Sequence, residues 1–246
     1  MTKTSIGAAV KKALHHEGKP LAIVLAGHNG SGKSTLWYKH LADDLHIPLI
    51  NADRMMLSIL PEHDARGQLR PWAQQLRDNN ELWMGIAQKG VQAFVAQAMG
   101  SQAAFAVETV FSYWEPQKDG AVKSKIDMIH ELQAAGYFVL LIFVGLTNVN
   151  LSIGRVETRK LEGGHDVEFR KLLERFPRTQ HAINAALDIA DAAILFDNSR
   201  SQGLAFTPVQ IRKKSTVIFD IRTASQRVPK AITQWLDIVA PSDMST

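Results

Sequence analysis

The segment from residue 27 to residue 34 constrains this chain more than any other part of it. It reads Gly-His-Asn-Gly-Ser-Gly-Lys-Ser, which matches the pattern G-x-x-x-x-G-K-[ST] of a phosphate-binding loop. A short apolar run at residues 21–25 precedes it, and apolar residues at helical spacing follow it over residues 33–45. Strand, glycine-rich turn and helix in this order are the context that the pattern requires. The alternative is an ordinary glycine-rich turn.

The chemistry of such a loop comes from its backbone and from two side chains. Glycines let the backbone wrap around phosphates with its N–H groups turned inward, and the following helix points its positive end at them. Lys33 is predicted to be catalytic and to reach the β- and γ-phosphates of ATP, and the Ser34 hydroxyl is predicted to be a ligand of Mg²⁺. The residues predicted to bind ATP are Gly27, His28, Asn29, Gly30, Ser31, Gly32, Lys33, Ser34 and Thr35.

The rest of the chain alternates between short apolar segments and helical patterns. Apolar segments end at residues 25, 50, 107, 144 and 196, and residues 208–219 suit a terminal hairpin. This alternation predicts an α/β, three-layer fold of the P-loop kinase type with a mostly parallel sheet of five or six strands. No linker interrupts residues 1–246, so a single domain is expected. Residues 148–185, two arginine-bearing helices, are predicted to form a lid over the site.

Composition excludes several classes of site and partner. The 246 residues include no cysteine, which rules out disulfides, cysteine-based zinc sites and thiol catalysis. No signal peptide and no apolar run long enough for a bilayer are found, so we expect a cytoplasmic protein without a membrane partner. The net charge of +4 suits a protein that handles phosphates but is too small and too evenly spread to indicate nucleic acid.

Two carboxylates follow predicted strands at their carboxyl ends, where ligands bind in open α/β sheets. Asp53 is predicted to be the catalytic base that accepts the proton of an acceptor hydroxyl, and its alternative role is to cap the helix that follows. Glu108 is predicted to bind the acceptor or to orient a water on Mg²⁺, and its alternative is a salt bridge. The long strand that ends at Val144 runs into Gly145-Leu146-Thr147 without a carboxylate, which counts against a motor or switch ATPase.

Arginines gather in the predicted lid, beside the pair Gly163-Gly164. A guanidinium group matches phosphate oxygens, and a flexible glycine pair lets such a segment close over a bound substrate. Arg155 is the first candidate for a catalytic contact with the transferred phosphate. The alternative is a pair of solvated helices with salt bridges between residues four apart.

Taken together, these segments resemble the zeta-toxin family of kinases, in its shorter, single-domain branch. The resemblance spans residues 21–199. It rests on the phosphate loop read as AGHNGSGKST, Asn51-Ala52-Asp53, Phe105-Ala106-Val107-Glu108-Thr109, the stretch from Arg155-Val156 to Gly163-Gly164-His165, Glu174-Arg175-Phe176-Pro177-Arg178, and Asp197-Asn198-Ser199.

The resemblance implies a P-loop kinase that uses ATP and Mg²⁺ at Lys33 and Ser34. It also implies Asp53 as the base, Glu108 and Thr109 near the acceptor, and Arg155 on the transferred phosphate. In the best-known family activity the acceptor is the 3′-hydroxyl of UDP-N-acetylglucosamine, and an antitoxin protein holds the enzyme inactive.

This chain departs from the typical toxins at two places. Residues 108–112 read Glu-Thr-Val-Phe-Ser instead of Glu-Gly-Thr, which brings Ser112 into the predicted acceptor site, and Gly-Gly-His stands where those toxins have a second arginine. The resemblance implies a small-molecule acceptor, UDP-N-acetylglucosamine or a related nucleotide sugar. The alternatives are a nucleoside, an antibiotic or a polynucleotide end as acceptor, or a regulatory P-loop ATPase.

Overall fold

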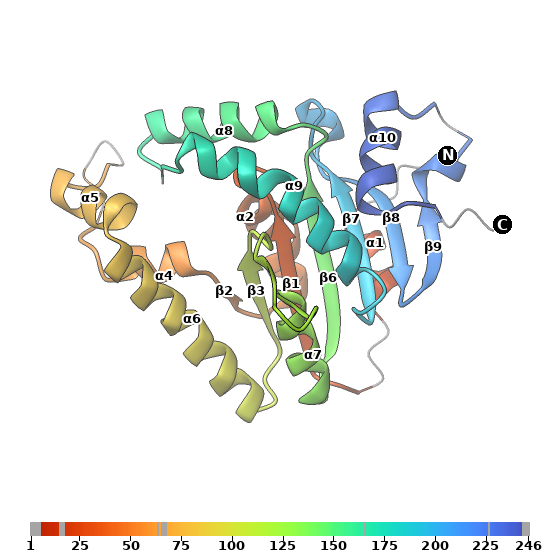
Figure 1. Ribbon diagram of the computed structural model, residues 1–246, viewed down its shortest axis with the longest axis horizontal. Helices are drawn as coiled ribbons and strands as arrows, with labels where there is room; N and C mark the ends of the chain where they lie inside the picture. The colour runs from red at the N-terminus through yellow and green to blue at the C-terminus, as the bar shows by residue number, and fades with distance from the viewer. Residues whose placement is uncertain are drawn as a thin grey trace.

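The computed structural model describes residues 6–14, 18–62, 64, 68–164, 166–225 and 227–242. Its centre is a seven-stranded sheet with helices on both faces (Figure 1). The two central strands, β1 (Leu21–Gly27) and β6 (Phe138–Gly145), are almost entirely buried, as continuous apolar runs in a parallel sheet are expected to be. The prediction of an α/β fold of the P-loop kinase type with a mostly parallel sheet is confirmed.

The strand order shows at which edge of the sheet the carboxyl ends of the parallel strands lie. The order is β2-β3-β1-β6-β7-β8-β9, and the first five strands are parallel, so their carboxyl ends share one edge. The sheet has seven strands rather than five or six because the C-terminal hairpin pairs antiparallel with β7. The remaining strands are β2 (Leu49–Ile50), β3 (Phe105–Thr109), β7 (Ala192–Asp197), β8 (Thr207–Lys213) and β9 (Thr216–Asp220).

Alternating side chains of β1 pack in two separate apolar clusters, one on each face of the sheet. Ala22 and Val24 pack in the cluster beneath α7, α9 and α10, whereas Ile23 and Leu25 pack in the cluster that contains α1 and α2. This division produces the three layers of the fold. The helices of these layers are α1 (Ile6–Ala13), α2 (Lys33–Leu36), which continues through a π-helical turn (Trp37–Leu41) into α3 (Ala42–Leu45), α7 (Ile126–Ala134), α9 (Phe169–Ala186) and α10 (Lys230–Val239).

A second group of helices lies beyond the β2 edge of the sheet, at the left of Figure 1. The region 72–99, which the sequence pattern suggests is one helical stretch, is divided by Asn80, whose side chain caps a new helix by accepting from the N–H of Trp83. We call the helices on the two sides of this break, together with α4, the acceptor arm. It consists of α4 (Ala52–Ser58), α5 (Pro71–Asn79) and α6 (Glu81–Gly100).

The predicted lid, residues 148–185, covers α8 (Val149–Leu161) and all of α9 except its last residue (Figure 1). The second half of α9 belongs to the core, because Ala182, Ile183 and Ala186 are fully buried. The remaining elements are a small hairpin, β4 (Trp114–Pro116) with β5 (Val122–Ser124), and two 3-10 turns, Gln202–Leu204 and Ile221–Thr223. Within the described part of the chain, no helix combines the length and the apolar character needed to cross a membrane.

Candidate active site

The phosphate loop leaves the carboxyl end of β1 and enters α2 at Lys33. Gly30 and Gly32 have φ angles of 69° and 94°, a left-handed conformation that favours glycine. A Cβ at Gly32 would lie 2.7 Å from the side-chain nitrogen of Asn198. The sequence therefore needs glycine here both for the turn and for the close approach of the loop after β7.

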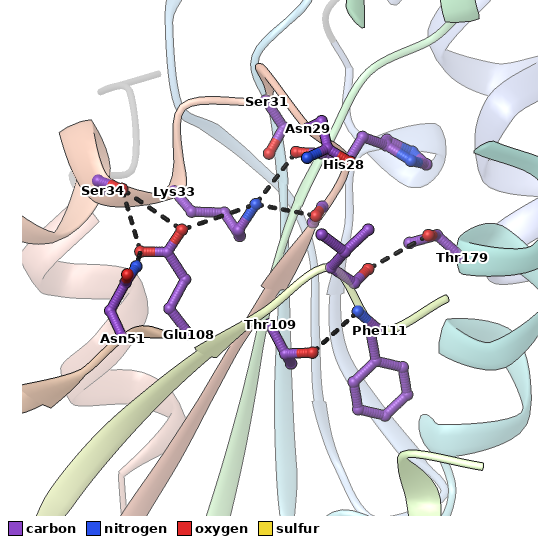
Figure 2. Close-up of polar contacts among 12 residues, drawn as sticks. His28, Asn29, Ser31, Lys33, Ser34, Asn51, Glu108, Thr109, Phe111 and Thr179 are labelled. Atoms are coloured by element: carbon purple, nitrogen blue, oxygen red, sulfur yellow. Dashed lines mark hydrogen bonds and ion pairs between the residues drawn. The ribbon is translucent and has the colours of Figure 1, made fainter. Parts of the chain in front are cut away.

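Lys33 is folded back over its own loop. Its Nζ donates to the carbonyl oxygens of Gly27 and His28 at 3.0 and 3.1 Å and lies 3.7 Å from a carboxylate oxygen of Glu108 (Figure 2). Burial lowers the pKa of Lys33, while the Glu108 and Asp53 carboxylates act in the opposite direction. The ammonium group is thus fixed at the centre of the loop.

Glu108, at the end of β3, connects three segments of the chain. Its carboxylate accepts from the Ser34 hydroxyl at 3.0 Å and from the Asn51 side-chain amide at 2.7 Å (Figure 2). Of the two predicted roles, this position suits a partner of the Mg²⁺ site better than a contact to a distant acceptor. The predicted alternative, a strand-end salt bridge, is also present, since Lys33 lies 3.7 Å away.

The donor set at Ser34 and Glu108 fits Mg²⁺, which takes oxygen ligands and keeps several waters when it binds with phosphates. One hydroxyl and one carboxylate meet at 3.0 Å, both next to the phosphate loop. No group of three or more histidine or acidic side chains suited to a metal is found in the parts of the chain that the structure describes. The residues present therefore match a metal shared with phosphates, not an all-protein cage.

Asp53 is not the cap of its helix. That role belongs to Asn51, whose side-chain oxygen accepts from the N–H of Arg54 at 3.0 Å. The predicted capping alternative for Asp53 is therefore wrong, because the helix begins at Ala52, two residues earlier than that role requires. Asp53 is exposed and lines the large pocket beside the phosphate loop.

The chain after β3 is held in an unusual conformation. Phe111 has a φ of 62° and is buried to 1% exposure, and its N–H donates to the Thr109 hydroxyl at 3.1 Å (Figure 2). A non-glycine residue in this region needs such local support. Thr109, Phe111 and Ser112 all line the pocket, so the strained turn shapes the predicted acceptor site.

These residues surround one pocket of about 1250 Å³, which is larger than the clefts that hold one small ligand. We call the side next to the loop the phosphate end, and the side along α6 the acceptor end. Of the predicted site residues, those that line the pocket are Asn29, Gly30, Lys33, Ser34, Asp53, Glu108, Thr109 and Ser112, and those that do not are Gly27, His28, Ser31, Gly32, Thr35 and Arg155.

His28 supports the loop from behind. Its ring is 2% exposed, stacks on Phe176 of α9 with ring centres 4.0 Å apart, and meets Phe143 edge-on. Burial, reinforced by the charge of Lys33, lowers the pKa of His28 to about 3, so the ring is neutral at physiological pH. Its predicted contribution to ATP binding therefore rests on its backbone.

Arg155 does not face the pocket in this conformation. Its guanidinium donates to the carbonyl of Asn198 at 2.8 Å, and the Asn198 side chain in turn donates to the carbonyl of Ser31 at 2.7 Å. Ser152, one turn earlier in α8, donates to the carbonyl of Asn29 at 2.6 Å. The beginning of α8 is thus bound to the outside of the phosphate loop, and a contact between Arg155 and the transferred phosphate stays a prediction.

Other arginines of the predicted lid line the pocket instead: Arg159, Arg175 and Arg178. Arg159 lies one helical turn after Arg155 in α8. The helical spacing of the sequence therefore favours Arg159 as a phosphate contact as much as it favours Arg155. The solvated-helix alternative also holds in part, since Arg170 and Arg178 both pair with Glu174, four residues away. His165, which belongs to the predicted Gly-Gly-His motif, lies outside the described residues.

Comparison with known proteins shows to which family the chain belongs. A protein-family model described as Zeta toxin matches residues 6–224. The chain belongs to the zeta toxin family. Membership in this family agrees with the P-loop kinase type of fold, in which the phosphate loop follows β1. No curated protein matches the chain at a significant level.

Solved structures similar to this zeta toxin family member share its fold at low sequence identity. One is the AvrRxo1-ORF1:-ORF2 structure with ATP, at a TM-score of 0.57 and 16% identity, covering 93% of this chain and 66% of that chain. Another comes from the PezAT chromosomal toxin–antitoxin system of Streptococcus pneumoniae, at a TM-score of 0.52 and 13% identity, covering 94% of this chain and 84% of that chain. The chain thus spans just under two thirds of the AvrRxo1 chain that it matches.

Proposed function

We propose that this zeta toxin family member is an ATP-dependent kinase that transfers the γ-phosphate to a hydroxyl group of a small molecule. The observation that carries the proposal is the placement of Lys33, Ser34, Glu108 and Asp53 around one end of a single large pocket. An AvrRxo1 structure with the same fold was solved with ATP, which supports the choice of nucleotide.

At the phosphate end, Lys33 and the backbone of the loop bind the β- and γ-phosphates. Ser34 and Glu108 would hold Mg²⁺, which would neutralise negative charge on the phosphates. Arg159 and Arg175 line the same pocket, and guanidinium groups directed at a transferring phosphoryl group stabilise the charge that develops there.

Asp53 acts as the base. Its carboxylate is exposed, lines the pocket and is close enough to Lys33 to influence the pKa of that lysine. A hydroxyl of the acceptor placed between Asp53 and the γ-phosphate gives its proton to the carboxylate as its oxygen forms the bond to phosphorus. The bond from the γ-phosphorus to the bridging oxygen breaks, and ADP leaves with the electron pair.

The acceptor end combines cations with an apolar wall. Such a lining suits a molecule that has both phosphates and a planar or apolar part, and UDP-N-acetylglucosamine or a related nucleotide sugar has these features. We therefore place a nucleotide sugar there. Besides Lys33, Arg159 and Arg175, the cationic residues that line the pocket are Lys125, Lys171 and Arg178, and the apolar residues that line it include Met84, Val91, Val95, Met99 and Met128.

An antitoxin partner and a cytoplasmic location complete the proposal. The PezAT neighbour is named as part of a toxin–antitoxin system, which supports an antitoxin as the partner.

The experiment is a transfer assay with γ-labelled ATP and purified protein. UDP-N-acetylglucosamine, uridine, a 5′-hydroxyl oligonucleotide and a no-acceptor control are tested in parallel, with Lys33→Ala as the inactive variant. The proposal predicts label on the sugar nucleotide, at its 3′-hydroxyl. Label on uridine or on the oligonucleotide would replace the acceptor but keep the kinase, whereas release of free phosphate alone, equal with and without acceptors, would indicate a regulatory ATPase.

A further inference from the structure

Arg77, in the last turn of α5, is a charged residue buried to 5% exposure. Burial of a guanidinium group is costly unless its N–H groups are satisfied. Two of them are directed at the neighbouring carboxylate, with Nε and Nη2 donating to the two oxygens of Asp78 at 2.7 and 3.0 Å. Arg77 and Asp78 thus form an ion pair in the acceptor arm, and Asp78 itself lines the pocket.

The other side of the same guanidinium contacts a distant part of the chain. Nη1 donates to the carbonyl of Gly163 at 3.0 Å, and Nη2 donates to the carbonyl of Gly164 at 3.0 Å. These two glycines lie 86 and 87 residues further along, at the end of α8. Arg77 therefore joins the acceptor arm to the predicted lid, and we call this contact the clasp.

The glycine pair is not a loose hinge in this structure but the cap of α8. The N–H of Gly164 donates to the carbonyl of Arg159 at 2.8 Å, and the N–H of Gly163 donates to the carbonyl of Lys160 at 3.0 Å. With Gly163 at a φ of 82°, this is a Schellman cap. A Cβ at Gly164 would lie 2.8 Å from the Arg159 carbonyl oxygen. The cap therefore fixes the backbone that carries Arg159.

Electrostatics favours a cation at this place. The last carbonyls of a helix carry the negative end of its dipole, and a positive group placed beside them, as Arg77 is at the two glycines that follow α8, stabilises the helix terminus. Arg77 supplies that group from another helix, with Asp78 balancing its charge on the side that faces the pocket. The end of α8 is thus held in position by α5.

We propose that Arg77 is a positioning residue that couples the acceptor arm to Arg159. The clasp holds the end of α8 so that Arg159 lines the phosphate end of the pocket, while α5 continues through Asn80 into α6, which lines the acceptor end. Displacement of the arm therefore displaces Arg159, and phosphoryl transfer depends on an arm that is packed against the lid. The inference rests on the proposed kinase function for its kinetic part only.

The geometry also explains why the residue is arginine. Four hydrogen bonds, two to a carboxylate and two to adjacent carbonyls, use a planar fork with N–H groups on both edges. A lysine ammonium has three donors at a single point and cannot face both partners in this way. Arg77→Lys should therefore restore little of what Arg77→Met removes.

The first test needs no substrate. Hydrogen exchange is measured on the ligand-free full chain for Arg77→Met, Arg77→Lys and the control Arg70→Met, which changes an exposed arginine at the beginning of the same helix. Exchange at residues 159–164 and 71–79 should rise together by about tenfold in both Arg77 variants, because buried hydrogen bonds are lost. It should stay unchanged in the control. Unchanged exchange at residues 159–164 in Arg77→Met, with the thermal midpoint of the wild type, would overturn the clasp.

The second test asks whether Arg77 acts through Arg159. With ATP and UDP-N-acetylglucosamine, Arg77→Met should lower kcat about tenfold and leave the Kd of ATP unchanged, whereas in an Arg159→Ala background it should lower kcat less than about twofold. Equal losses in the two backgrounds would contradict the coupling. If the wild-type protein transfers phosphate to no acceptor, the proposed function fails, and hydrogen exchange at residues 159–164 alone decides on the clasp.

Discussion

The two ends of the pocket are built from different kinds of contact. At the phosphate end, Lys33, Ser34 and Glu108 hold one another through hydrogen bonds and an ion pair, within segments that end at the same edge of the sheet. At the acceptor end, one face of α6 presents Val91 and Val95 to the pocket, and that helix is fixed by packing on the core and by a hydrogen bond from the Tyr137 hydroxyl to the carbonyl of Ala98. The first end is set by local chemistry and the second by tertiary structure, so they should respond differently to substitution.

The largest effect is expected at Lys33. Lys33→Ala removes the positive charge at the centre of the loop, and no other residue of the loop supplies one, so phosphate transfer should fall below detection. Lys39→Ala, which changes an exposed lysine in the same helical segment, is the matched control and should retain wild-type activity. Transfer within a few-fold of wild type in Lys33→Ala would remove the basis for the phosphate end.

Arg159 should have the next largest effect. Because Arg159 lines the pocket, Arg159→Ala should lower kcat about 10²-fold while the Kd of ATP changes little, as expected for a contact that strengthens in the transition state. Arg170→Ala is the control, because that exposed residue pairs only with Glu174 in the contacts described. Equal activity of the two variants would return Arg159 to the solvated-helix explanation.

Arg155 provides a second comparison within α8. Its hydrogen bond to Asn198 supports the loop at Ser31, so Arg155→Ala should weaken ATP binding as well as transfer, in similar proportion. A loss confined to kcat would instead favour the sequence-based prediction that Arg155 contacts the transferred phosphate. Measurements of ATP affinity and of kcat on the same preparation distinguish the two results.

The same difference between the two ends explains what the sequence could predict. The phosphate loop, Asp53 and Glu108 each follow the end of a predicted strand. Their position at the same edge of the sheet could therefore be predicted from chain order alone. The contact of Arg77 with Gly163 spans 86 residues and needs the packing of α5 against α8, which no local pattern contains. The two glycines at residues 163 and 164 suggest a hinge in the sequence. Only the structure shows that their carbonyls accept hydrogen bonds from Arg77.

The acceptor end should respond to a change that leaves the phosphate end alone. Val95→Thr keeps the shape of the side chain and places a hydroxyl on the apolar wall, which should raise the acceptor KM about tenfold without changing the KM of ATP. Ala93→Ser, on the exposed face of the same helix, should change neither value. A rise in both KM values for Val95→Thr would mean that the two ends are not separable.

The smallest effect on activity is expected at His28, where the test is of stability against pH. The pKa of His28 is about 3 in the folded protein and near 6.5 when unfolded, so between these values the unfolded state binds one more proton. Relative to His28→Phe, the free energy of unfolding of the wild type should fall by about 1.4 kcal/mol per pH unit as the pH is lowered from 6.5 toward 3. Parallel stability curves in denaturant titrations would show that the ring is not neutral.

The central claim is that the phosphate end binds ATP while Asp53 removes the proton of the acceptor, and Asp53→Asn tests it most directly. The variant keeps the size of the side chain and loses the proton acceptor. Measured together, the Kd of ATP should stay within about twofold of wild type, while single-turnover transfer to UDP-N-acetylglucosamine should fall by about 10²- to 10⁴-fold. A large loss of ATP affinity with transfer of the bound nucleotide intact would contradict the account, because Asp53 would then belong to the nucleotide or metal site.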